Sequence, residues 1–129
     1  MGKPAYDSLL DWLREEFGDS LRWVASFDSD SFGYNVRYVR EDLKTELTNL
    51  QLEYVIHRSM AIYNRDHLED VYAHLGTAES LVVQHDEAMA VHVYFEGSKG
   101  VVVKLAKDAS VRTPEFYDAA MDRLFAEAG

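Results

Sequence analysis

The chain has 129 residues, of which 47% are hydrophobic, and 23 acidic against 13 basic residues give it a formal net charge of -10. This length suits one domain, residues 1–129, and is too short for two. The acidity disfavours nucleic acid and anionic membranes as partners, and the lack of cysteine excludes disulfides and thiol chemistry. No apolar run is long enough to span a bilayer, so we expect a cytoplasmic protein with no membrane or nucleic-acid partner.

The first element in the chain is an amphipathic helix over residues 6–17. Its apolar side chains fall within one arc at 100° per residue, and Gly18 supplies a C-terminal stop. The residues in that arc are Tyr6, Leu9, Leu10, Leu13 and Phe17.

Residues 21–27 then change to strict alternation, which indicates a strand. One side of this strand consists of Leu21, Trp23, Ala25 and Phe27. A second strand over residues 34–39 follows a polar loop, and the two predict a hairpin.

The stretch from Glu41 to Tyr63 is a long predicted helix with apolar residues on two sides. One sheet face covers only one of these sides, so the other needs a second chain or the next short helix as its cover. The first possibility predicts a homodimer. Its interface candidates are Leu43, Leu47, Leu50, Tyr54, Val55 and Ile62.

A short helix over residues 65–75 is the competing cover. We expect Gly76 to end it and four apolar residues to form its buried stripe. That stripe consists of Leu68, Val71, Tyr72 and Leu75.

Three strands follow, over residues 80–84, 88–96 and 101–106. The three valines from Val101 to Val103 are apolar on both faces, so the last strand should be central. A final helix opens at Thr113-Pro114-Glu115. The order α-β-β-α-(α)-β-β-β-α predicts an α+β fold with one five-stranded antiparallel sheet and helices on both faces.

The sharpest chemical hypothesis concerns His67, Asp70 and His74, which share one helix face and have the spacing of three metal ligands. That face also resembles a solvated surface, so we predict no metal site, no cofactor and no catalytic residue. Of the other histidines, His57 is predicted in the core or an interface, His85 in a turn and His92 in the sheet.

Two further motifs have plainer explanations. Asp28 to Gly33 resembles the start of a calcium loop, but Val39 replaces the bidentate glutamate and the flanks are strands. Gly97 to Gly100 spells GxxG, but it joins two strands, which indicates a hairpin turn.

Four stretches of the chain resemble small acidic haloarchaeal proteins of uncharacterised function, a resemblance that implies a halophilic protein. The stretches are Leu21–Phe27, Tyr34–Asp42, Ala90–Phe95 and Gly100–Leu105. The element order also resembles that of roadblock proteins, in which a central helix covers one sheet face and the terminal helices cover the other. This resemblance implies dimerisation through the central helix and an edge strand, and a role as scaffold or regulator of small GTPases. The short helix over residues 65–75 is an addition to that pattern.

Our leading hypothesis is therefore a non-enzymatic interaction or regulatory module. We expect it to form a homodimer and also to bind a second protein, whose identity is unknown. The alternative is a small-molecule sensor domain, which predicts a pocket between sheet and helices lined by aromatic residues such as Trp23, Tyr34 and Tyr94. A metal-dependent enzyme at His67, Asp70 and His74 is the third.

Overall fold

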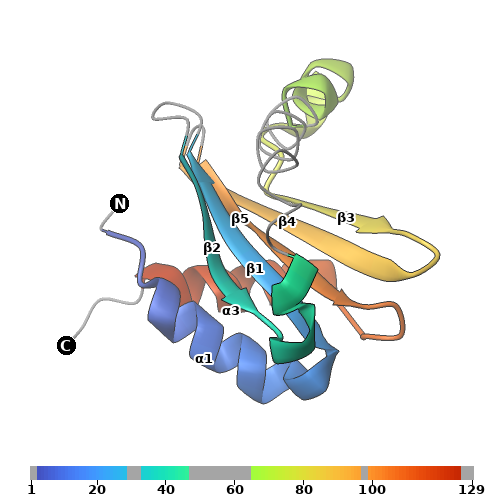
Figure 1. The fold of residues 1–129 in the computed structure, drawn as a ribbon. Coiled ribbons are helices and arrows are strands. Elements are labelled where there is room, and N and C mark those ends of the chain that lie inside the picture. Colours follow the sequence, from blue (N-terminus) through green and yellow to red (C-terminus); the bar gives the residue numbers. More distant parts are fainter. Residues whose placement is uncertain (1–2, 29–32, 47–64, 97–98, 126–129) are drawn as a thin grey trace.

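One antiparallel sheet organises the part of the chain that the computed structural model describes, residues 3–28, 33–46, 65–96 and 99–125. Its strand order is β2-β1-β5-β4-β3 (Figure 1). The strands are β1 (Leu21–Asp28), β2 (Gly33–Val39), β3 (Ser80–Gln84), β4 (Ala88–Glu96) and β5 (Lys99–Ala106). The predicted hairpin thus lies beside the predicted three-stranded meander, and β5 is central, as its valines indicated.

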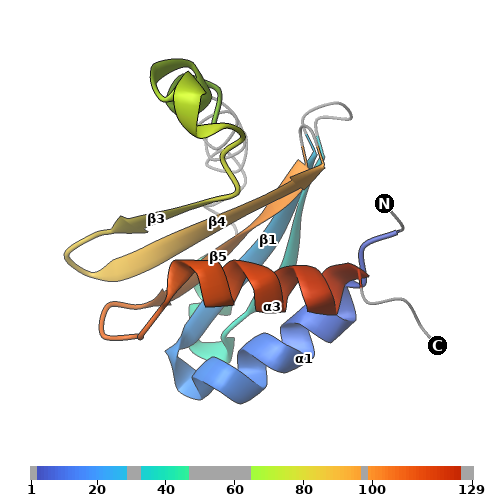
Figure 2. The same ribbon diagram turned by 180° about the vertical axis from the view of Figure 1, so that it is seen from behind.

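Two helices, α1 (Tyr6–Phe17) and α3 (Thr113–Phe125), pack side by side on one face of the sheet (Figure 2). The Ala5 N–H donates to the Leu124 carbonyl at 2.8 Å and joins the two helices at their ends. Leu9 and Leu13 of α1 are fully buried, which confirms the predicted stripe. The buried residues of this main core are Leu9, Leu13, Leu21, Val24, Met89, Val91, Val93, Val101, Val103, Leu105, Phe116, Ala120 and Leu124.

The opposite face of the sheet carries a second, smaller core. It consists of Trp23, Ala25, Phe27, Tyr94 and Val102. Alternation along β1, β4 and β5 divides their side chains between the two cores, because successive residues of a strand point to opposite faces.

Leu21 corrects the predicted face of β1. It lies in the main core with Val24, whereas Trp23 lies in the second core. The pairing of β1 with β5 shifts register between Leu21 and Trp23. Such a bulge inserts one extra residue, so the alternation seen in the sequence is out of phase beyond it.

The region of the predicted long helix begins differently from the expectation. Residues Glu41–Glu46 form a 3-10 helix, η2, and Leu43 within it is half-buried. The Leu43 N–H donates to the Arg40 carbonyl at 2.8 Å, and the Arg40 guanidinium pairs with Asp42 at 2.6 Å. The remaining interface candidates, Leu47, Leu50, Tyr54, Val55 and Ile62, lie outside the described residues, as does His57.

The predicted short helix is present, but its predicted buried stripe is wrong. Residues 65–71 are α-helical, and a 3-10 helix, η3 (Ala73–Leu75), follows and ends at Gly76, where φ is 86°. Val71, Tyr72 and Leu75 are 53%, 48% and 71% exposed. The α-helix ends at residue 71, so Tyr72 and Leu75 lie outside it and do not continue its periodicity, while Val71 faces solvent within the helix itself. The segment lies at the rim of the sheet, away from α1 and α3 (Figure 1).

Within the described residues, no helix is long and apolar enough to cross a membrane.

Candidate functional site

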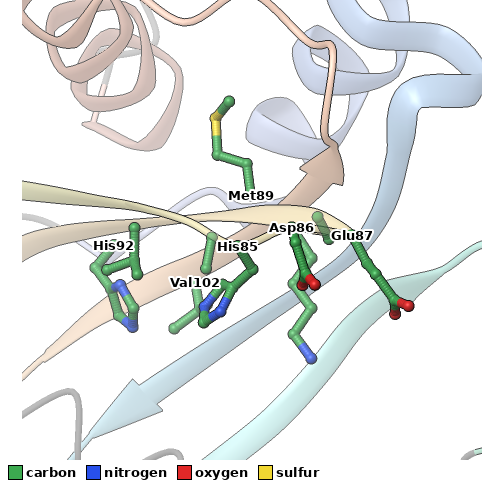
Figure 3. A pocket seen from close by; sticks show the side chains of 10 residues that line it. His85, Asp86, Glu87, Met89, His92 and Val102 are labelled. Atoms are coloured by element: carbon green, nitrogen blue, oxygen red, sulfur yellow. The ribbon is translucent and has the colours of Figure 1, made fainter.

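A cavity of about 580 Å³ lies on the sheet face opposite α1 and α3, at the turn that joins β3 to β4 (Figure 3). This volume falls within the range of pockets that bind small molecules. The residues that line it are Val83, His85, Asp86, Glu87, Ala88, Met89, Ala90, His92, Val102 and Lys104.

Cross-strand register brings the cavity's wall residues together. Ala90 and His92 lie on the same face of β4, and they pair with Lys104 and Val102 of β5. Residues two apart in a strand share a face, so the two pairs form one continuous surface. Half-buried Val83 of β3 pairs with Ala90 and extends the wall toward the sheet edge.

The Lys104 side chain is held on this face by an aromatic neighbour. Its ammonium nitrogen lies 4.7 Å from the centre of the Trp23 ring, and the two residues pair across β5 and β1. A cation over an indole face is attracted by the negative charge of the π-system. The positive charge of Lys104 is thereby positioned beside the apolar wall.

The His92 imidazole stacks on Tyr94, with ring centres 6.2 Å apart and an interplanar angle of 14°. The Arg65 guanidinium also lies over the Tyr94 ring, 5.0 Å from the ring centre, and Arg65 forms a salt bridge with Glu69 at 3.2 Å. Burial raises the pKa of Tyr94 to about 12, because removal from water disfavours the phenolate. Tyr94 thus stays neutral between its two basic neighbours at physiological pH.

The turn from His85 to Glu87 forms the mouth of the cavity. The His85 N–H donates to the Ala88 carbonyl at 2.8 Å and closes the hairpin. His85, Asp86 and Glu87 are exposed, and their side chains lie on the same side of the sheet as that of His92 (Figure 3). The cavity therefore combines an apolar wall, the ammonium of Lys104 and two carboxylates.

The aromatic lining predicted for a sensor pocket is wrong for this cavity. Neither Trp23 nor Tyr94 lines it, because both are buried in the second core, at 4% and 2% exposure. The side chain of Tyr34 lies outside the described part of the structure. His92 and Lys104 were not predicted to meet at a site, and only the pairing of β4 with β5 could have indicated it.

The three residues considered as metal ligands in the sequence do not converge. His67, Asp70 and His74 are all exposed, and among the residues that the structure describes no group of three or more histidine, cysteine or acidic side chains could hold a metal ion. The α-helix that would align them ends at residue 71, and His74 belongs to η3. The one-face spacing on which the hypothesis depends is therefore interrupted.

A second surface feature is the outer edge of β3. The Glu79 carbonyl accepts from the Tyr94 N–H at 3.0 Å, and His85 bonds to Ala88 as above. In an antiparallel pair alternate residues bond to the neighbour, so the N–H and C=O groups of Ser80, Val82 and Gln84 point outward. The strand SLVVQ has no charged residue and no proline, and its register with β4 is unbroken. Edges of this kind lack the usual obstacles to pairing with another strand.

Comparison with protein-family models finds a match over residues 7–125, to a domain of unknown function numbered DUF7522. No curated protein matches the chain significantly.

Proposed function

Since the chain belongs to the DUF7522 family, whose description names no activity, we propose from its surface that it is a non-enzymatic protein-interaction module that forms a homodimer. The observation that carries this proposal is the uncharged outer edge of β3. The other edge strand, β2, contains Arg37, and its pairing with β1 is interrupted by a bulge between Val24 and Ala25. The two edges thus differ in how readily another strand can join them.

A two-fold axis through Val82 gives the most regular pairing of two copies. Ser80 then lies opposite Gln84 of the partner subunit, and Val82 lies opposite its own copy. The outward backbone groups of these residues would form about six hydrogen bonds and join two sheets into one. Backbone bonds contribute only about 1 kcal/mol each, so apolar contact must supply the rest of the affinity.

Exposed apolar residues close to β3 can supply that contact. Leu75 is 71% exposed and lies five residues before Ser80, and Val71 and Tyr72 are about half exposed. Removing such large side chains from water is favourable by about 1.5 kcal/mol or more for each one fully buried. The pairing axis also sets Glu79 opposite His85 of the partner subunit.

The roadblock resemblance supports the same proposal by analogy, because α1 and α3, the terminal helices, also share one sheet face here. The acidic composition supports the further proposal of a protein that works in concentrated salt, since hydrated carboxylates keep a surface soluble there.

The test is the oligomeric state of the unmodified protein in concentrated potassium chloride, measured by light scattering and sedimentation. We expect a dimer mass, and a monomer mass at high micromolar concentration would overturn the proposal. Val82→Pro removes one outward N–H without removing a bond to β4, so it should yield a folded monomer. Val82→Thr keeps that N–H and is the matched control, which should remain dimeric.

A ligand-binding role is the second candidate function, and the cavity beside His92 and Lys104 is the observation that favours it.

A further inference from the structure

We propose that the cavity at the β3–β4 turn binds a small uncharged molecule with a compact hydrocarbon body. The proposal deepens the second candidate function, the ligand-binding role, and it does not depend on the dimer. The apolar lining of the cavity comes from short side chains of three neighbouring strands, which favour a hydrocarbon group over a polar one. These residues are Val83 of β3, Ala88 and Ala90 of β4, and Val102 of β5.

A decrease in side-chain size along β4 accompanies the hollow. Every second residue of β4 faces this side of the sheet, and toward the turn these side chains become smaller. In that order they are Tyr94, His92, Ala90 and Ala88. Ala88 in turn pairs with another alanine, Ala106 of β5. Larger apolar residues here would add contacts between the strands, so the alanines leave space at the expense of packing. Such local departures from the best packing are expected at functional sites.

The two basic side chains that border this wall within the sheet are already engaged inside the protein. The ammonium nitrogen of Lys104 lies 4.7 Å from the centre of the Trp23 ring. The His92 imidazole stacks on Tyr94, with ring centres 6.2 Å apart. Lys104 and His92 each take part in a further interaction as well. A ligand carboxylate would therefore have to compete with existing partners before it gained a counter-charge.

A charge on the ligand is therefore a disadvantage in this cavity. A charged group that leaves water for an apolar wall loses its hydration, and only a partner can restore the free energy. An anion also meets Asp86 and Glu87, exposed at the mouth, and a net charge of -10. A cation can pair with these carboxylates only in water, where an ion pair contributes little. An uncharged hydrocarbon gains contact with the wall and has no charge to remove from water.

Three compounds that share one hydrocarbon cage test the charge requirement by isothermal titration. They are 1-adamantanol, which is uncharged, 1-adamantanecarboxylate and protonated 1-adamantylamine. We expect the alcohol to bind about tenfold or more tightly than either charged analogue, because its cage enters the cavity while its hydroxyl stays in water at the mouth. Equal or tighter binding of a charged analogue, or no binding of the alcohol, would overturn the proposal.

Two cavity-filling variants and a matched control locate the site. Ala90→Leu and Ala88→Leu each place a larger apolar side chain in the cavity, so each should weaken the binding of 1-adamantanol by about tenfold or more. Ala119→Leu should leave it unchanged, because Ala119 belongs to α3 on the opposite face of the sheet and does not line the cavity. Unchanged binding in both cavity variants, or an equal loss in Ala119→Leu, would refute the assignment. Light scattering on the same samples reports the oligomeric state, so a failure of the homodimer proposal is distinguished from a failure of this one.

Discussion

Replacing Gly100 by alanine should destabilise the fold more than an ordinary glycine substitution in a strand, because two aromatic rings close over this position. Gly100 pairs with Phe27 on one side and with Tyr94 on the other. The two rings meet edge to face, with centres 6.0 Å apart and an interplanar angle of 72°. Glycine lacks the Cβ that would separate them.

The magnitude follows from what the new methyl group would meet. A Cβ at Gly100 would clash with the backbone carbonyl oxygen of Val93 and lie 2.5 Å from Cζ of Phe27. Carbon atoms in favourable contact lie about 3.5–4.0 Å apart, so ring and backbone must both move. Overpacking of this kind costs about 1–3 kcal/mol. For a chain of this length we expect the melting temperature to fall by roughly 4–12 °C.

Thermal and denaturant unfolding of single and double variants measure the effect. Phe27→Leu removes the ring atom in the way, so its combination with Gly100→Ala should cost less than the sum of the two single changes. The recovery should be partial, because the Val93 carbonyl remains. Gly76→Ala is the control: a Cβ there meets nothing within 4 Å, and its cost comes from a φ of 86°, so it should add independently to Phe27→Leu. A Gly100→Ala protein that melts at the same temperature as the unmodified protein would refute the reasoning.

Three further predictions concern pH, salt and metal. Burial raises the pKa of Tyr94 from 10.0 to about 12, so the folded state stays protonated to a higher pH than the unfolded chain. The stability that this difference contributes is present below pH 10 and is lost as the pH rises toward 12. After allowance for screening, the free energy of unfolding should fall by about 1–2 kcal/mol. Denaturant melts at pH 9 and 11 should show this decrease in the unmodified protein and no such decrease in Tyr94→Phe. Stability should rise from low to multimolar potassium chloride, because screening relieves the self-repulsion of a net charge of -10; a flat or falling melting temperature would remove the halophilic proposal. Zinc or nickel should leave the melting temperature unchanged. Tight binding would instead stabilise the fold by roughly 2.7 kcal/mol at a metal concentration a hundred times the dissociation constant. A rise in melting temperature that the double variant His67→Ala, His74→Ala abolishes would contradict this prediction.

The sequence by itself determined the sheet and the helices of its main core. The alternation in β4 and the consecutive valines of β5 indicate strands that are buried on both faces. The spacing of the apolar residues in α1 indicates a helix that is buried on one face. These patterns are local: each residue's own position along a strand or helix decides its side. The pairing of a hairpin with a meander followed from their order, because neighbouring elements of a chain usually pack together.

Only the tertiary structure decided which predicted surfaces are covered. Periodicity groups Leu68, Val71, Tyr72 and Leu75 on one side of a helix, but it cannot show that the helix ends at residue 71 or that most of these side chains meet solvent. A single inserted residue at the β1 bulge likewise moved Leu21 to the other face. Such changes depend on contacts with distant segments, which local spacing does not record.

The candidate site is the clearest case. His92 and Lys104 stand twelve positions apart, and the sequence around each predicts only a strand. They line one cavity because the pairing of β4 with β5 sets Ala90 opposite Lys104 and His92 opposite Val102. A one-residue change of register would turn every one of these side chains to the opposite face, since the side-chain period of a strand is two. The sequence thus supplied the residues of the site, and the register between strands brought them together.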